Sequence, residues 1–389
     1  MHAGGSYLVP MKWISAYTAV LFCLLVQPAR SQDSAAARWW NPAVSSPRAI
    51  EGQAWPEETG QPYGRLPARA EKSVSAEVWN LSQQAAGLVV RFKTNAEKIT
   101  VRYQVAGPQA MPHMPATGVS GVDLYGIDAA GTWLWCAGKW AFKDTIEYNF
   151  SNLQPEHADA QGIEYRLYLP LYNTVRWLEI GVPLRSKLAP LPARKIKPIV
   201  VYGTSIAQGA CASRPGMAWT AILSRRLDLP VINLGFSGAG RLDPEMTKLI
   251  TEVPARVFVL DCLPNLVGGK ATFTETDIYD RLMAAVKQIR AVQARTPIIL
   301  TDHFGYTDAP VSPVKRALYK TANRINHQVV KDLAAQGVGS VYLLPVEQLQ
   351  QDADTMVDGI HPSDLGMMRY AAAYEALIKM ILNGKPFQP

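Results

Sequence analysis

Two short segments in the second half of the chain carry residue types that could perform nucleophilic catalysis. Ser205 follows Gly203 and Thr204 directly after an apolar run, and Asp358 stands three residues before His361. A serine hydroxyl attacks a carbonyl carbon only when a base removes its proton. An imidazole oriented by a carboxylate is suited to that task, and one turn can hold the aspartate and the histidine together. These segments predict acyl-transfer chemistry.

Two further segments carry groups that could stabilise an oxyanion. Residues 233–238 read Asn-Leu-Gly-Phe-Ser-Gly and end at Gly238, whose small size lets a main-chain N–H approach a substrate oxygen. Residues 261–265 read Asp-Cys-Leu-Pro-Asn and end at Asn265, which offers a side-chain amide. Each segment alone is a weak indication, since such residues are more often found in ordinary loops and turns. All four together, three of them directly after successive strands and the fourth just before the last helix, are a much stronger indication.

The elements that would position these groups alternate between strand and helix after Pro198. Continuous apolar runs predict parallel strands covered on both faces, at residues 199–202, 231–234, 257–260, 298–301 and 341–344. Helical patterns occupy residues 217–226, 244–251, 278–295, 314–336 and 362–382. This alternation predicts a doubly wound α/β sandwich. Ligands bind such sheets beyond the carboxyl ends of the strands, where all four segments are expected to meet.

The first half of the chain has a different periodicity. Short alternating runs separated by turn residues predict strands at 86–92, 99–105, 122–125, 132–135, 164–169 and 175–180, which indicates an all-β sandwich or jelly roll. Residues 185–198 are rich in Pro and Lys and predict a linker. We therefore expect a β-domain at 32–184 and an α/β domain at 199–389.

Residues 1–31 have the features of a secretory signal peptide. Lys12 precedes an apolar run at 13–26, and the small residues Ala29 and Ser31 precede a plausible cleavage site. The run is short for a transmembrane helix, although an uncleaved anchor is the alternative. We expect a secreted or periplasmic protein with no stable membrane association once the signal is removed.

Composition excludes several other classes of protein. Hydrophobic residues make up 48% and charged residues 18% of the 389 residues, which does not fit a disordered chain. Without the signal, 37 Lys and Arg face 32 Asp and Glu, a net charge of +5, and no long basic run is present. A nucleic-acid partner is therefore not expected. Ten Trp and sixteen Tyr favour packed β-structure or a carbohydrate-facing surface.

Three cysteines remain after signal removal: Cys136, Cys211 and Cys262. Export permits disulfides, and Cys211 and Cys262 lie near the predicted site and could pair. The alternative is that all three cysteines are buried thiols. No CxxC or HxxxH spacing occurs, so neither a metal site nor a cofactor is expected.

The four segments together resemble those of the SGNH (GDSL-type) hydrolases. The resemblance implies Ser205 as nucleophile, His361 as base and Asp358 as its partner. It also implies an oxyanion hole formed by the side chain of Asn265 and the backbone N–H groups of Gly238 and Ser205.

The chain departs from the family pattern at two positions. Thr204 replaces the usual aspartate before the serine, and Leu266 replaces the aspartate after Asn265. Neither change removes a catalytic group. In the first half, residues 120–125 read Ser-Gly-Val-Asp-Leu-Tyr and resemble the GxDLY signature of SGNH-type esterases that carry an N-terminal β-domain.

The resemblance implies a carboxylic ester hydrolase that removes short acyl groups, O-acetyl above all, from a poly- or oligosaccharide. A lipid-directed esterase or lysophospholipase, a sugar-binding protein and an acyltransferase on the same scaffold stay open as alternatives. The sequence does not specify the glycan, the acylated position or the oligomeric state.

Several residues near the four segments are candidates for substrate contact: Trp219, Phe236, Arg241, His303 and Tyr306. Core packing or a solvated loop is the plainer interpretation for each of them. His113 begins a long loop inside the β-half that could reach over the active site, although such a loop more often only connects strands.

Overall fold

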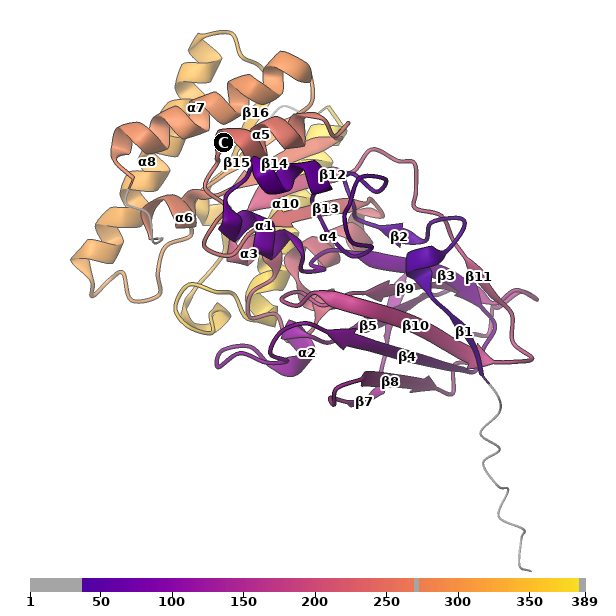
Figure 1. Ribbon diagram of the computed structural model, residues 1–389. Coiled ribbons are helices and arrows are strands. Elements are labelled where there is room, and N and C mark those ends of the chain that lie inside the picture. Colours follow the sequence, from indigo (N-terminus) through magenta and orange to yellow (C-terminus); the bar gives the residue numbers. More distant parts are fainter. Residues whose placement is uncertain (1–36, 269–272, 385–389) are drawn as a thin grey trace, which may run out of the picture. The chain divides into compact units, whose positions relative to one another are not determined.

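A parallel sheet of buried strands forms the centre of the C-terminal half. It contains β12 (Ile199–Gly203), β13 (Val231–Gly235), β14 (Val257–Asp261), β15 (Ile298–Thr301) and β16 (Val341–Leu344). Their order is β13-β12-β14-β15-β16, and every pair is parallel. The chain therefore moves from β12 to one neighbour and then to the other, which makes the carboxyl end of β12 a topological switch point. Figure 1 shows this sheet in the computed structural model, which describes residues 37–268 and 273–384.

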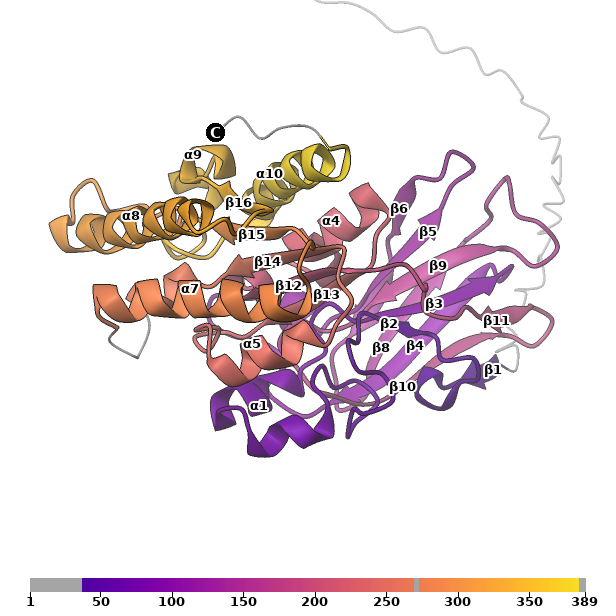
Figure 2. The same cartoon turned by 90° about the horizontal axis from the view of Figure 1, so that it is seen from above.

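Helices cover both faces of this sheet (Figure 2), because alternate strand residues face opposite layers. Val200 and Tyr202 pack with α5 (Pro244–Thr251), α7 (Glu275–Val292) and α8 (Pro313–Ala335). Ile199 and Val201 pack with α4 (Trp219–Leu227) and α10 (Asp364–Leu382). The predicted doubly wound α/β sandwich is confirmed.

The boundaries of α7 show how capping decides where a helix starts. The apolar pattern predicted a helix at 278–295, whereas α7 begins at Glu275. Thr274 and Asp277 form a capping box, in which each side chain accepts the backbone N–H of the other residue. This satisfies N–H groups of the first helical turn, so the helix begins before its apolar stripe.

The N-terminal half is an antiparallel β-sandwich, as predicted. One sheet has the order β1-β10-β4-β8-β7, and the other has the order β11-β3-β9-β5-β6, with β2 paired to β3. The strands are β1 (Ala37–Trp40), β2 (Ile50–Glu51), β3 (Val89–Thr94), β4 (Lys98–Val105), β5 (Asp123–Ile127), β6 (Trp133–Cys136), β7 (Lys139–Ala141), β8 (Ile146–Ser151), β9 (Ile163–Tyr168), β10 (Val175–Pro183) and β11 (Leu188–Pro190). The apolar side chains between the two sheets form a core of their own.

One strand lies where a linker was predicted. Within residues 185–198, β11 pairs with β3 at the edge of its sheet, and Arg91 of β3 donates to the backbone oxygen of Pro192. Three residues that include a proline carry no recognisable strand pattern. The pairing is favourable because residues 92–94 of β3 offer backbone hydrogen-bond partners at the edge of the sheet. Part of the predicted linker is therefore bound to the β-sandwich.

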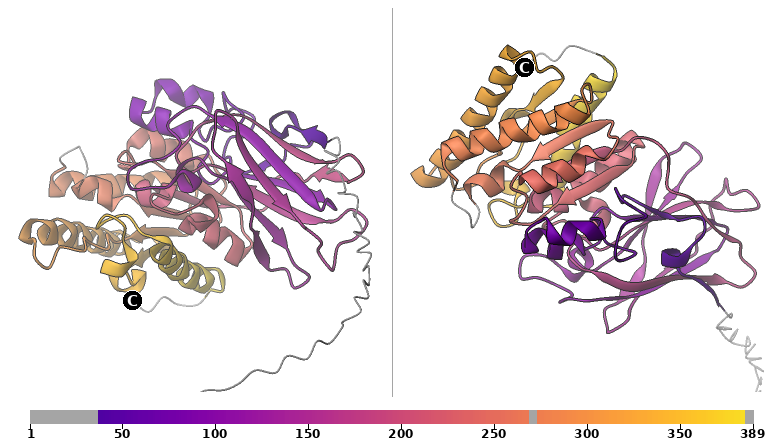
Figure 3. Two further views of the ribbon diagram at one scale, coloured as in Figure 1. Left: turned by 90° about the horizontal axis from the view of Figure 1, so that it is seen from below. Right: turned by 45° about the horizontal axis from the view of Figure 1, so that its top comes forward.

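The segment before the sandwich packs on the α/β half instead. Trp55, Leu66 and Val78 belong to the same apolar cluster as the residues of α5. Figure 3 shows the helix α1 (Ala76–Ser82), in indigo, beside that part of the α/β half. Residues 55–82 therefore contribute to the core of the α/β half, although they precede the β-sandwich in sequence.

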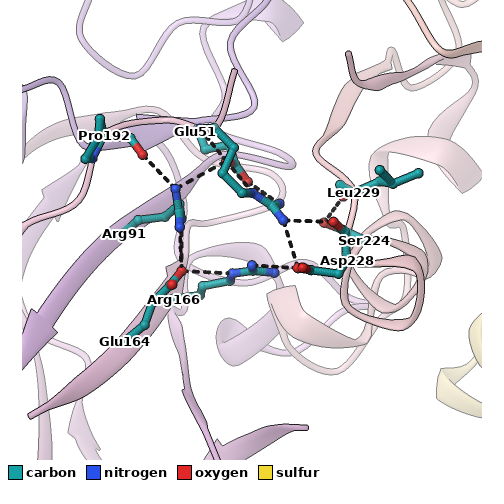
Figure 4. A network of polar contacts seen from close by, with 9 residues as sticks. Glu51, Arg91, Glu164, Arg166, Pro192, Ser224, Asp228 and Leu229 are labelled. Atoms are coloured by element: carbon teal, nitrogen blue, oxygen red, sulfur yellow. Dashed lines mark hydrogen bonds and ion pairs between the residues drawn. The ribbon is translucent and has the colours of Figure 1, made fainter. Parts of the chain in front are cut away.

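An ion-pair network also connects the two halves (Figure 4). The Arg194 guanidinium donates to both carboxylate oxygens of Glu51, at 2.7 and 2.9 Å, and to Asp228 at 2.8 Å. Arg166 of β9 donates to the same Asp228 oxygen at 2.9 Å, as Figure 4 shows. Burial raises the pKa of the Glu51 carboxyl, but the bonds from Arg194 outweigh burial and hold that pKa below its ordinary value. Sandwich, linker and α4 are thus held together by charge-assisted bonds.

The cysteines do not form the disulfide that was one alternative. Cys136, Cys211 and Cys262 are free thiols. The Cys262 Sγ lies 3.5 Å from the backbone oxygen of Tyr202, inside the core. Pairing of Cys211 with Cys262 is therefore wrong for this structure, and Cys136, which is only partly buried, also differs from the three-buried-thiol alternative.

The predicted signal peptide at 1–31 lies outside the described residues and stays a prediction. Among residues 37–268 and 273–384, no helix combines the length and the apolar character that crossing a bilayer requires.

Candidate active site

Ser205 lies immediately beyond the carboxyl end of β12, at the switch point of the sheet. It is the first residue of the short helix α3 (Ser205–Gln208), and the Thr204 side chain caps that helix by accepting the N–H of Ile206 at 3.3 Å. A β-carbon on Gly203 would lie 2.6 Å from that of Ala207, so only glycine permits so sharp a turn. The Ser205 hydroxyl is thereby directed away from the strand.

The turn before α10 brings an imidazole and a carboxylate to this serine. The Ser205 Oγ lies 2.8 Å from Nε2 of His361, and the His361 Nδ1 lies 2.7 Å from Oδ2 of Asp358. The other Asp358 oxygen accepts the backbone N–H groups of Ile360 and His361 at 3.2 and 2.9 Å. A carboxylate only accepts, so the imidazole proton belongs on Nδ1 and Nε2 is free to accept from the serine.

The hydrogen bonds at Asp358 keep its side chain charged. Burial raises the pKa of the Asp358 carboxyl, but the bonds from the His361 ring and from the two backbone N–H groups outweigh burial, so the pKa lies below its ordinary value. A carboxylate that is ionised at neutral pH can stabilise an imidazolium beside it.

The segment after β13 presents Gly238 in a conformation that favours glycine. Its φ is +71°, and a β-carbon there would meet no atom within 4 Å. Backbone conformation, not crowding, therefore selects glycine at this position. The loop is fixed on both sides, since the N–H of Phe236 donates to Gly203 and the N–H of Ser237 donates to the Gln208 side chain.

Asn265 lies in α6 (Leu263–Val267), directly after β14. One terminal atom of its amide faces the backbone N–H groups of Gly240 and Ala239, at 3.1 and 3.3 Å. Because two donors point at that atom, it is assigned as the oxygen. This assignment turns the –NH₂ group of Asn265 away from these donors, so it can serve as a donor itself.

A buried arginine that the sequence analysis did not select lies behind the Gly238 loop. Arg65 is 1% exposed and donates to four backbone oxygens at 2.7–3.1 Å. These acceptors are Leu81, Gln84, Asn233 and Gly235. Burial lowers the pKa of this guanidinium to about 9. Arg65 thus connects α1 to the end of β13. No local pattern distinguishes it in the sequence from a surface arginine.

We expect Arg65→Met to lower both stability and turnover. Each buried carbonyl left without a donor costs about 1–3 kcal/mol, and the loop that presents Gly238 loses its support. The free energy of unfolding should fall by several kcal/mol, and kcat should fall with little change in KM. Denaturant unfolding and steady-state kinetics would measure these changes.

Arg69→Met is the matched control for this prediction. Arg69 lies in the same segment but is half-exposed, and it forms ion pairs with Glu58 and Glu252. Exposed ion pairs contribute less than about 1 kcal/mol, so this variant should stay close to wild type. Equal effects of the two substitutions would contradict the positioning role of Arg65.

The loop that carries His113 reaches the site. The rings of His113 and His361 stack with centroids 6.1 Å apart and an interplanar angle of 28°. The Thr117 hydroxyl donates to the backbone oxygen of Ser213 at 2.7 Å, which fastens the loop to the segment after α3. The β-sandwich therefore contributes a side chain next to His361 and its contacts with Ser205 and Asp358.

Three of the proposed substrate contacts lie in the interior instead. Trp219, Phe236 and His303 are 0% exposed. Trp219 stacks on Tyr374 at 4.3 Å, the Phe236 ring lies under Arg65, and burial lowers the pKa of His303 to about 3. These three residues therefore pack in the core and do not contact substrate as expected, because burial of an apolar or neutral ring is favourable.

Arg241 and Tyr306 are only partly buried. Arg241 forms an ion pair with Glu77 of α1 at 3.1 Å. Tyr306 lies beside Gly268 at the end of α6, where a β-carbon would meet its hydroxyl at 2.3 Å. Both stay candidates for substrate contact.

The doubly wound α/β fold is that of a hydrolase acting on esters, as comparison with known sequences shows. The family model described as GDSL-like lipase/acylhydrolase matches residues 196–379. The model described as the N-terminus of SGNH-hydrolase-type esterases, GxDLY, matches residues 37–188. The chain belongs to the GDSL-like SGNH hydrolase family and carries its GxDLY N-terminal domain.

Solved structures cover the same two-part architecture. A GDSL-like lipase candidate from Bacteroides ovatus is 30% identical, with a TM-score of 0.80 over 90% of this chain and 98% of that one. The salicylyl-acyltransferase SsfX3 from a tetracycline biosynthetic pathway is 19% identical, with a TM-score of 0.69 over 90% of this chain and 98% of that one. An acetyl xylan esterase from the rumen bacterium Butyrivibrio proteoclasticus is 10% identical, with a TM-score of 0.51 over 89% and 99%. No curated protein matches the chain.

Proposed function

We propose that this protein is an exported serine esterase that removes short acyl groups, O-acetyl above all, from carbohydrate. The observation that carries the proposal is the continuous chain of contacts from Ser205 Oγ through the His361 ring to Asp358, at 2.8 and 2.7 Å. These distances are within the range for proton transfer between nucleophile and base.

In the proposed first half-reaction, Ser205 attacks the ester carbonyl while His361 Nε2 takes the hydroxyl proton. Asp358 stabilises the resulting imidazolium through Nδ1. The developing oxyanion accepts hydrogen bonds from the backbone N–H groups of Ser205 and Gly238 and from the Asn265 amide. Collapse of the intermediate breaks the bond to the sugar oxygen, which takes the proton from His361 and leaves as a hydroxyl group.

In the second half-reaction, His361 takes a proton from water, which attacks the acyl-enzyme at Ser205. The same three donors receive the second oxyanion. Its collapse breaks the bond to Ser205 Oγ, His361 returns the proton to that oxygen, and the carboxylic acid leaves. A sugar hydroxyl could replace water in this step, which would make the enzyme an acyltransferase. The similarity of fold to an acyltransferase supports testing for that outcome.

The carbohydrate assignment has separate support. An acetyl xylan esterase has the same fold over most of both chains. On this chain, two large aromatic side chains of the sandwich, Trp135 and Trp140, are 45% and 51% exposed. Tryptophan side chains have an apolar body, and the exposed parts of these two rings suit contact with sugar rings.

Acetate release from a panel of acetylated polysaccharides tests this proposal. We expect release from at least one acetylated glycan, none from lysophospholipid, and none from any substrate with Ser205→Ala. Adding an unacetylated oligosaccharide as acceptor would reveal transfer as a newly acylated sugar. Release of fatty acid from lysophospholipid without acetate release from any glycan would favour a lipid-directed esterase. Glycan binding without turnover of any ester would favour a sugar-binding protein.

A further inference from the structure

A thiol, a second imidazole and a carboxylate lie together beside the proposed triad. One ligating atom from each of Cys211, His113 and Asp358 lies within 4.8 Å of the other two. The residues come from the segment after α3, from the loop between β4 and α2 (Ala116–Val119), and from the turn before α10. Sequence spacing could not predict this cluster, because its members are far apart along the chain.

The backbone holds Cys211 in an unusual conformation. Its φ is +66°, a left-handed value that residues with a β-carbon rarely adopt and that costs about 1–3 kcal/mol. Its side chain is directed toward Asp358, since the Sγ lies within 4.8 Å of a ligating oxygen of that carboxylate. The surrounding structure therefore imposes the position of the thiol.

Close packing fixes the segment that carries the thiol. A β-carbon on Gly118 would lie 2.3 Å from the backbone oxygen of Ala212, so the loop from the sandwich approaches this segment as closely as glycine allows. On the other side, Ser213 donates its N–H and its hydroxyl to the Asp364 carboxylate at 2.9 and 2.5 Å. His113 and Asp358 are both exposed, but Asp358 accepts three hydrogen bonds, whereas the ring of His113 stacks on His361. His113 is therefore the member of the cluster with most freedom to move.

We propose that Cys211, His113 and Asp358 form a site for Zn²⁺ and that Zn²⁺ bound there inhibits the esterase. Thiolate, imidazole and carboxylate are the three ligand types that Zn²⁺ takes from proteins. Metal–ligand bonds of about 2.0–2.3 Å in a tetrahedron place the ligating atoms about 3.5 Å apart. The cluster must therefore contract by about 1 Å, which rotation of the His113 side chain supplies. The thiol proton passes to solvent as the Zn–S bond forms, and water fills the fourth position.

Inhibition follows from the position of Asp358, and this part rests on the proposed function. The same carboxylate accepts the Nδ1–H of His361. A divalent cation on that carboxylate cancels the negative charge that stabilises the imidazolium, so His361 becomes a weaker base. The His113 ring, which supplies the second ligand, also stacks on His361, so the bound ion lies close to the proposed base.

Binding is tested with Co²⁺, whose thiolate charge-transfer absorption reports a Co–S bond without any substrate. The wild-type chain should develop this band with one Co²⁺ per chain, and excess Zn²⁺ should abolish it. Cys211→Gly removes the thiol while accepting the left-handed backbone, so it should fold and show no band. His113→Ala should weaken Co²⁺ binding at least about tenfold. Cys136→Ser, which removes a thiol outside the cluster, should bind like wild type.

Inhibition is tested by titrating Zn²⁺ into the esterase assay, with each variant compared to its own metal-free activity. Cys211→Gly should need at least about tenfold more Zn²⁺ for half-inhibition than wild type. Ser205→Ala should keep the Co²⁺ band, which separates failure of the metal site from failure of the proposed esterase. A band that persists in Cys211→Gly, or a folded wild-type chain that develops none with saturating Co²⁺, would overturn the site.

Discussion

Replacing Ser205 by alanine is expected to lower kcat by roughly 10⁶, to the level left by the oxyanion donors and substrate binding alone. The hydroxyl lies 2.8 Å from Nε2 of His361, and no other atom can take its place as the acyl acceptor in the proposed mechanism. Loss of the hydroxyl leaves the imidazole with no proton to remove. Release of 4-nitrophenol from 4-nitrophenyl acetate, followed by single-turnover kinetics, would measure the loss.

Ser237→Ala is the matched control, since Ser237 lies in the neighbouring loop after β13. Its backbone N–H, which binds Gln208, is retained in the variant. Loss of its hydroxyl removes at most one hydrogen bond of about 1 kcal/mol, so kcat should fall by less than about tenfold. Similar activities of Ser205→Ala and wild type would end the assignment of the nucleophile.

Asp358→Asn is expected to lower kcat at neutral pH by about 10⁴ while KM changes little. The geometry explains why. The backbone N–H groups of Ile360 and His361 both donate to Oδ1, so the amide oxygen of the variant should occupy that position. The –NH₂ group then faces His361 Nδ1 and donates to it. The imidazole proton is displaced to Nε2, the atom that must accept the proton of Ser205.

Asp354→Asn offers the corresponding control. Asp354 is an exposed residue of the 3₁₀ helix η4 (Ala353–Thr355), four positions before Asp358. The same change of charge there should leave kcat within a factor of about two, because an exposed group is screened by solvent. If Asp358→Asn, like the control, kept more than a tenth of wild-type turnover, Asp358 would not be the partner of His361.

Much of the α/β half could be predicted because its signals are local. The strand at 298–301 and the helix at 244–251 were predicted with the boundaries that β15 and α5 have in the structure. Continuous apolar runs and helical periodicity are properties of neighbouring residues, and burial on both faces of a parallel sheet makes them strong. The edge strand β11 was missed, because its pairing depends on a partner about a hundred residues away.

The residues of the candidate site also fall into two groups, those that local sequence could predict and those that it could not. Ser205, Asp358 and His361 could be selected from short motifs, since each motif is also the local turn that presents its side chain. Trp219 and His303 were misplaced, because nearness in sequence to a motif does not tell on which side of a strand end a ring packs. Arg65 was not selected from the sequence, because its four acceptors lie 16–19 and 168–170 residues away along the chain.

The sequence by itself therefore determined the two fold classes, the order of the strands along the chain and the residue types of the site. Only the tertiary structure decided that residues 55–82 support the α/β half and that His113 of the sandwich lies against His361. It also decided that Cys211 lies beside Asp358 rather than bonded to Cys262. The physical reason is that periodicity and turn chemistry arise between neighbours in the chain. Contacts between domains depend on which surfaces bury each other, and no short stretch of sequence encodes that choice.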